Sequence, residues 1–179
     1  MATRFQRSAI GSKMRTFASI LIAVILVLSG CSRNTDSLAF QVSPGWKLDN
    51  QTPSGLHFYI LSANTPGEGS FILSPWSAII KPEEIPTQVQ HLADSFSIQA
   101  PVSGIVLASH DYLVENFSGA EGRGSYAMFQ ISRGGTNILQ TLFMMSVDNR
   151  IWYGQFMGSS NGWPQTLTML KSVRKIRKQ

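Results

Sequence analysis

The sequence predicts an α+β fold in which one antiparallel β-sheet of about six strands is flanked by helices. Short runs rich in β-branched and aromatic residues recur along the chain, separated by brief turns of glycine, proline, asparagine and aspartate. One amphipathic helix interrupts these runs, and a second closes the chain. Because most connections are only a few residues long, we expect consecutive strands to be antiparallel neighbours.

The strand-like runs are recognised by their composition and their boundaries. Leu56–Ser62 is the first, and Ser70–Ile80 follows, with Pro75 indicating an edge position or a bulge. Four more runs form the expected meander: Gly104–Asn116, Ser125–Ser132, Asn137–Val147 and Ile151–Ser159. The last two are apolar on both alternating faces, so we expect them at the centre of the sheet, beneath helices.

Two stretches have helical periodicity. The first is expected to begin near Pro86 and to end at Ala100-Pro101, and its apolar face is Val89, Leu92, Ala93 and Phe96. The second is expected to have Pro164 in its first turn, and its apolar stripe is Trp163, Leu167, Leu170, Val173 and Ile176.

The first thirty residues have the layout of an export signal. These residues include four basic side chains, all before Phe17, and no acidic one. Phe17–Leu28 is apolar apart from Ser19, and small residues follow it. The tetrad Leu28-Ser29-Gly30-Cys31 resembles the lipobox of bacterial lipoproteins, which implies cleavage before Cys31 and its diacylation. An uncleaved membrane anchor and an unlipidated, cleaved signal are the alternatives. Ser32 in place of aspartate favours, by resemblance to enterobacterial lipoproteins, the periplasmic face of the outer membrane.

Cleavage of this leader would remove most of the net positive charge of the chain. Of the 15 basic residues, 11 remain against 10 acidic ones, so the mature part is nearly neutral and its charge does not indicate nucleic-acid binding. We therefore expect a signal peptide over 1–30, a polar tether over 31–39 and one α+β domain over 40–179. Cys31 is the only cysteine, so disulfides and a catalytic cysteine are both excluded.

The order of elements carries a second resemblance. A Pro-Gly-Trp opening at 44–46, a central helix, a glycine-punctuated meander and a last helix containing Leu170-Lys171-Ser172-Val173 resemble the PsbP-like fold, also found in DcrB-type lipoproteins. The resemblance implies an antiparallel sheet flanked by helices and an accessory or binding role without catalysis. Fold resemblance by itself does not establish function.

No arrangement of residues predicts catalysis or metal binding. Ser109-His110-Asp111 has the residue types of a hydrolase triad, but strand neighbours point to opposite faces. The three histidines, His57, His91 and His110, lack ligand spacing, so we expect no metal and no cofactor. The glycine-rich stretch Gly119–Gly124 is flanked by strands, which favours a turn over a phosphate-binding loop.

Two sets of residues are candidates for contacts with other molecules. Arg123, Tyr153 and Gln155 are expected to bind a partner, because Arg123 lies in the glycine-rich stretch and the other two share one face of a strand. The basic tail can complement a helix dipole or contact anionic lipid headgroups, and it consists of Lys171, Arg174, Lys175, Arg177 and Lys178.

These observations predict an exported, lipid-anchored domain that is not an enzyme and docks an envelope protein partner. One alternative is an immunity or inhibitor lipoprotein directed against a toxin or cell-wall hydrolase, with Asn64–Gly69 or Gly119–Gly124 as its protruding loop. A second is a small-molecule or lipid carrier, which requires an internal apolar cavity. A flat apolar patch favours docking, a shape-complementary loop favours inhibition, and a cavity favours a carrier.

Overall fold

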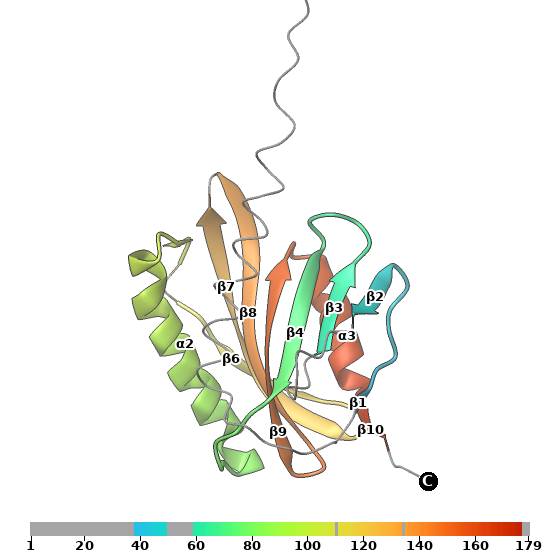
Figure 1. Ribbon diagram of the computed structural model, residues 1–179. Helices are drawn as coiled ribbons and strands as arrows, with labels where there is room; N and C mark the ends of the chain where they lie inside the picture. The colour runs from blue at the N-terminus through green and yellow to red at the C-terminus, as the bar shows by residue number, and fades with distance from the viewer. Residues whose placement is uncertain (1–37, 50–58, 110, 134, 177–179) are drawn as a thin grey trace, which may run out of the picture.

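The computed structural model describes residues 38–49, 59–109, 111–133 and 135–176 (Figure 1). The elements in chain order are β1 (Leu38–Ala39), β2 (Trp46–Asp49), β3 (Tyr59–Ala63), β4 (Gly69–Pro75), a 3-10 turn η1 (Pro82–Glu84), α2 (Ile85–Val102), β5 (Val106–Leu107), β6 (Val114–Ser118), β7 (Gly122–Arg133), β8 (Thr136–Val147), β9 (Arg150–Gly158), α3 (Gly162–Lys171) and β10 (Arg174–Lys175). Among the described residues, no helix is both long and apolar enough to cross a membrane.

The fold is α+β, with an antiparallel sheet in the order β2-β3-β4-β9-β8-β7-β5 and with β6 also paired to β7. The described part of this sheet thus has eight strands, and the expected number of about six was too low. Two features account for the difference. The short strand β2 was not predicted, and the run Gly104–Asn116 divides into β5 and β6, which pair with different stretches of β7.

The centre of the sheet is the pair β8 and β9, as the sequence predicted. Leu142, Phe143 and Met144 are successive residues of β8 and all are buried, so this strand is covered on both faces. The side chains of one face join α3 in one apolar core, and those of the other face join α2 in a second core. Each fully buried aliphatic or aromatic side chain contributes about 1.5–3 kcal/mol, so the two cores are the main stabilising element.

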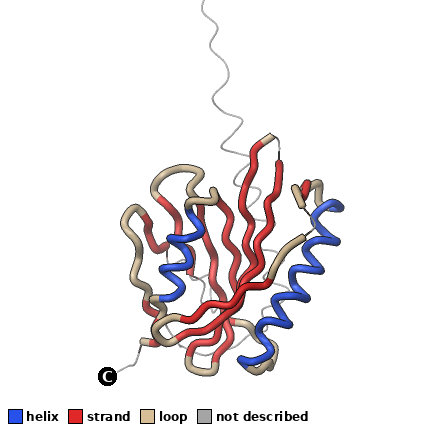
Figure 2. Tube along the Cα trace, turned by 180° about the vertical axis from the view of Figure 1, so that it is seen from behind, coloured by secondary structure: helices blue, strands red, loops and turns tan. Residues whose placement is uncertain are grey.

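The two helices cover opposite faces of the sheet at different places. α2 packs against β5, β6, β7 and β8, whereas α3 packs against β4, β7 and β9. Figure 2, the view from behind, shows the short helix α3 in front of the sheet and the long helix α2 along the right side of the molecule. In α2, Val89 and Ala93 are fully buried with Leu92 and Phe96 beside them, which confirms the predicted apolar face. The helix continues one residue beyond Pro101, to Val102.

The C-terminal segment differs from the prediction. α3 ends at Lys171, and Arg174–Lys175 forms β10, which pairs with β1. The Lys171 carbonyl accepts a hydrogen bond from the Ala120 N–H (2.8 Å), which helps to end the helix at the meander. Val173 is buried as expected, but Ile176 is 49% exposed and lies outside the core. Leu38 and Ala39, which we had assigned to the tether, belong to the fold through β1.

Gly154 allows the central strand to pack closely. A Cβ atom at this position would lie 2.2 Å from Phe143 Cζ and 2.5 Å from the Ile72 carbonyl oxygen. Phe143 in turn contacts Phe71 and Trp163, with ring centroids 6.2 Å and 6.1 Å apart. The aromatic core under α3 therefore requires glycine at this point of β9.

We expect Gly154→Ala to lower the free energy of unfolding by about 1–3 kcal/mol, because the added methyl group overpacks the core against a backbone carbonyl. Urea unfolding measures the change. Ser118→Ala, at an exposed position of β6, is the control and should change stability by less than about 0.5 kcal/mol. Equal stability of the two variants would contradict the packing described.

Candidate functional site

The candidate site is the part of the sheet that neither helix covers, on the face that α2 shares. On this face α2 lies over β5–β8. Among the described residues no helix packs on the β2, β3 and β4 part of this same face, since α3 contacts β4 from the opposite face. We call this surface the open face and define it by six partly exposed side chains of β3, β4 and β9: Ile60, Ser62, Ser70, Ile72, Gln155 and Met157.

The register of the strands arranges these side chains in two rows. Ile60 is paired with Ile72, and Ile72 with Gln155. Ser62 is paired with Ser70, and Ser70 with Met157. Adjacent strands lie about 4.8 Å apart, so each row crosses roughly 10 Å of sheet. The result is a surface on which one row has two isoleucines and an amide and the other has two serines and a methionine.

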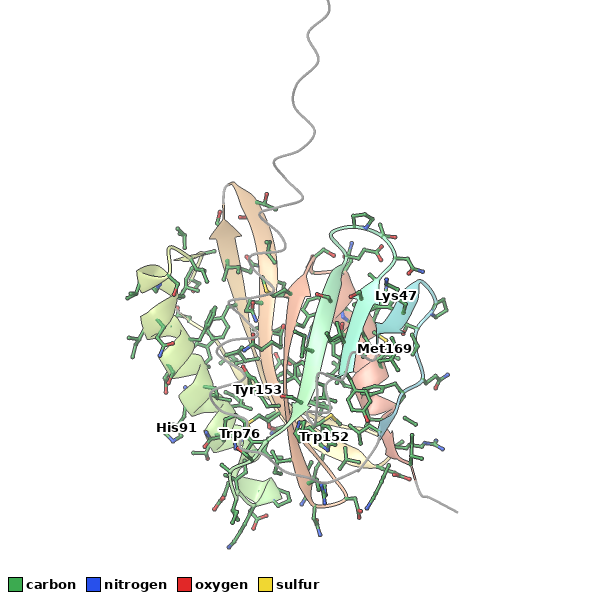
Figure 3. The ribbon with its side chains drawn as sticks, in the orientation of Figure 1. Lys47, Trp76, His91, Trp152, Tyr153 and Met169 are labelled. Atoms are coloured by element: carbon green, nitrogen blue, oxygen red, sulfur yellow. The ribbon has the colours of Figure 1, made fainter. Side chains whose placement is uncertain are left out.

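The boundary between the open face and the α2 core is formed by aromatic side chains. Tyr153 is 7% exposed, and its ring lies 5.6 Å from that of Trp76, centroid to centroid. Figure 3 shows both side chains between α2 and β4, with Lys47 further away on β2. Burial raises the pKa of Tyr153 to about 12, and the Gln155 amide donates a hydrogen bond to its hydroxyl oxygen. Tyr153 is therefore neutral at physiological pH and holds Gln155 in place.

Two buried hydrogen-bond donors on this side of the sheet have no acceptor among the described residues. They are Trp76 Nε1 and Gln140 Nε2. Gln140 is 3% exposed and is paired across the strands with Met157 of the open face and with Phe129 of the α2 core. A buried unsatisfied donor costs about 1–3 kcal/mol, so each of these two groups lowers the stability of the domain.

The chemistry of the open face suits recognition. Hydroxyl and amide groups can pair with backbone or side-chain polar groups of another molecule, while Ile60, Ile72 and Met157 provide apolar contact. No histidine or carboxylate is among its six residues, and on the neighbouring β2 two charged residues flank it, Lys47 opposite Ser62 and Asp49 opposite Ile60. The open face can therefore form both hydrogen bonds and apolar contacts with another molecule.

The structure separates the three residues predicted to bind a partner. Gln155 lies on the open face, whereas Tyr153 is buried beside α2, so of these two neighbours Gln155 is the one that the surface presents. The Tyr153 ring packs against Trp76, and this contact helps to bury the Tyr153 side chain. Arg123 is exposed on β7 and is paired with Ser146 of β8. Gln155 lies on β9, on the other side of β8, and is paired with Leu142. At about 3.4 Å per residue, the four-residue offset along β8 places Arg123 more than 10 Å from Gln155.

The glycine-rich stretch is not a protruding loop. Gly122–Gly124 belongs to β7, and the short turn before it is held to α3 by the Ala120–Lys171 hydrogen bond. Gly119 packs so closely on this helix that a Cβ atom would lie 2.3 Å from the Lys171 carbonyl oxygen. The glycines thus permit close packing of a hairpin on the helix end.

The basic tail is divided in the structure. Lys171 and Arg174 are exposed, while Lys175 Nζ lies 2.5 Å from Asp148 Oδ2 in an ion pair. Cys31, Arg177 and Lys178 lie outside the described residues, as do His57 and His110. His91 is exposed on α2, and the described residues contain no group of three or more histidine, cysteine, aspartate and glutamate side chains placed to bind a metal.

Sequence reasoning missed most of the open face. Its isoleucines alternate with the buried Leu61, Phe71 and Leu73, so both faces of β3 and β4 read as apolar. The available signal was the pair of serines, Ser62 and Ser70, which interrupts the apolar run on one face only. Gln140 carried a further signal, because its amide lies in the mostly apolar stretch Leu139–Met145, in which Thr141 is the other polar residue.

No protein-family model matches this chain, and no curated protein matches it. Solved structures share its general architecture at low identity. LpqN of Mycobacterium tuberculosis, involved in cell envelope biogenesis, has 10% sequence identity and a TM-score of 0.48 over 82% of this chain and 87% of its own. The PsbP protein CyanoP of Synechocystis has 10% identity and a TM-score of 0.46 over 84% of this chain and 99% of its own. These similarities assign neither a family nor an activity.

We expect Gln140→Met to raise the free energy of unfolding by about 1 kcal/mol or more, because it replaces a buried unsatisfied amide by an apolar side chain of similar length. Chemical denaturation of the isolated protein measures the change. Gln130→Met, at an exposed position of the neighbouring β7, is the control and should be nearly neutral. A loss of stability in Gln140→Met would show that the amide already has a partner within the domain.

Proposed function

We propose that the chain is a lipid-anchored, non-catalytic binding module of the cell envelope, with a PsbP-like domain that docks a protein partner through the open face. The observation that carries this proposal is a partly exposed sheet surface that no helix of the described residues covers, with two buried donors at its edges that have no acceptor among those residues. Natural domains pair nearly all buried polar groups, so unpaired ones at the margin of an exposed surface favour an interface.

A protein partner fits this surface better than a compact solute. Protein interfaces combine an apolar centre with polar groups at the rim, and here the neighbouring Ile60 and Ile72 are followed by Gln155 on β9, while Lys47 lies opposite Ser62 in the adjacent row.

The alternatives have less support. Inhibition requires a protruding loop, and one of the two candidate loops is held against α3. The carrier alternative has no observation in its favour among the described residues. We propose attachment to the envelope through Cys31, on the periplasmic face of the outer membrane, from the lipobox resemblance of the leader, and we propose no catalytic role because the open face presents recognition groups.

We expect a single stoichiometric protein to co-purify with the tagged, lipidated protein from crosslinked cells, and its recovery to fall at least about tenfold in Ile72→Lys. An ammonium group at the centre of the open face would be desolvated by docking, and a tenfold loss corresponds to about 1.4 kcal/mol. Quantitative mass spectrometry of the purified material measures the recovery.

Ser95→Lys is the matched control, because it adds the same charge at an exposed position of α2 away from the open face. Both variants should unfold at the urea concentration of the unmodified protein. If Ile72→Lys retains the partner as well as Ser95→Lys does, the open face is not the docking surface.

A further inference from the structure

The start of the described chain and the basic C-terminal segment lie side by side. Leu38 is paired with Lys175 and Ala39 with Arg174 in the β1–β10 ladder. The Leu38 N–H donates to the Tyr59 hydroxyl oxygen (2.6 Å), and the Leu38 side chain is buried. The end of the polar tether is therefore fixed to the fold beside β10, at the lower end of the molecule in Figure 1.

The end of α3 joins the same place. The Gln41 N–H donates to Ser172 Oγ (2.9 Å), directly after the last helical residue, Lys171. Lys171 and Arg174 are both exposed, and Ile176 is 49% exposed beside them. We call Lys171, Arg174 and Ile176 the anchor-side patch.

The charge around this patch is positive. Asp148 is engaged with Lys175, and the Glu121 carboxylate accepts a hydrogen bond from the Lys175 N–H (2.9 Å). Arg150 begins β9 directly after the turn that holds Asp148. Among the described residues, these two carboxylates are thus accompanied by four cations, Lys171, Arg174, Lys175 and Arg150. An exposed isoleucine among basic side chains is the composition of segments that lie at membrane interfaces.

The length of the tether brings the patch close to the bilayer. Cys31 precedes Leu38 by seven residues, a length of chain that can span at most about 25 Å. Electrostatic attraction to an anionic surface acts within a Debye length, about 8–10 Å at physiological salt. A domain tethered at β1 therefore samples headgroup contact most often with the elements that surround β1.

We propose that the anchor-side patch is a membrane-contact surface, in which Lys171 and Arg174 bind anionic lipid headgroups and Ile176 enters the interfacial region. The inference rests on the lipid anchor of the proposed function. The open face lies on the side of the sheet that α2 shares, and the patch lies at the end of α3. Membrane contact through the patch consequently leaves the open face accessible to a partner.

The test uses the full-length, processed protein reconstituted through its own lipid into phosphatidylcholine vesicles with or without phosphatidylglycerol. Since lipidation occupies the thiol of Cys31, an introduced cysteine is the only one that takes an NBD fluorophore. Ile176→Cys reports on the patch, and Thr136→Cys reports on the other end of β8. A nitroxide-bearing lipid headgroup quenches fluorophores that touch the membrane surface.

With anionic lipid, we expect quenching at position 176 to exceed that at position 136 by about threefold or more. We expect the excess to be lost in about 1 M salt, where the Debye length is about 3 Å, and in Lys171→Glu/Arg174→Glu. Equal quenching at the two positions, or an excess unaffected by lipid charge and salt, would overturn the proposal. The salt arm requires no further substitution, so it stands even if the charge-reversal variant folds poorly.

The anchor itself is checked with protein that has no introduced cysteine. If that protein takes up the fluorophore at Cys31, the lipid anchor of the proposed function is wrong and no tethered geometry exists. If it does not, and position 176 is quenched no more than position 136, the anchor stands and the membrane-contact surface is wrong.

Discussion

The arrangement of the domain depends on the burial of β8 and β9 on both faces. Consecutive residues of β8, from Gln140 to Val147, are buried, and β9 adds Trp152 on one face and Tyr153 on the other. A strand that is apolar on both faces requires a packing layer on each side. The chain supplies these layers with two helices of limited length, α3 with Trp163 against Phe143 and Phe156, and α2 with Val89 and Ala93.

Each helix covers only part of one face of the sheet, so some strand residues have no helix packed on them. α2 is placed over β5–β8 by its contacts with Phe129 and Met144, and this position leaves the β3 and β4 side of the same face to other contacts. The boundary carries the unpaired donors of Gln140 and Trp76. A core selected for stability alone would place apolar groups at these positions, and their retention is consistent with a functional requirement.

The sequence predicted the elements whose signals are local and strong. The helical spacing of Val89, Leu92, Ala93 and Phe96 and the doubly apolar β8 and β9 placed one helix and the centre of the sheet correctly. The end of α3 was not predictable from periodicity, because Val173 fits a helical stripe and a buried extended segment equally well. What ends the helix is a contact from the distant Ala120, and what forms β10 is pairing with β1.

The candidate site was only partly predictable for a related reason. Alternation placed Gln155 and Tyr153 on one face, but it does not tell which part of that face a helix covers. Tyr153 lies close enough to Trp76 to be buried, whereas Gln155, two residues further along β9, remains partly exposed. Such differences arise from the position of α2, which tertiary packing determines.

The measurement that tests the central claim most directly is photo-crosslinking in living cells from a single benzophenone side chain at Met157, on the open face. If the open face docks a protein, light produces one adduct of defined mass from this position. A benzophenone at Gln130, exposed on β7 away from the open face, should give no such adduct. The absence of an adduct from Met157, or the same adduct from both positions, would contradict docking through the open face.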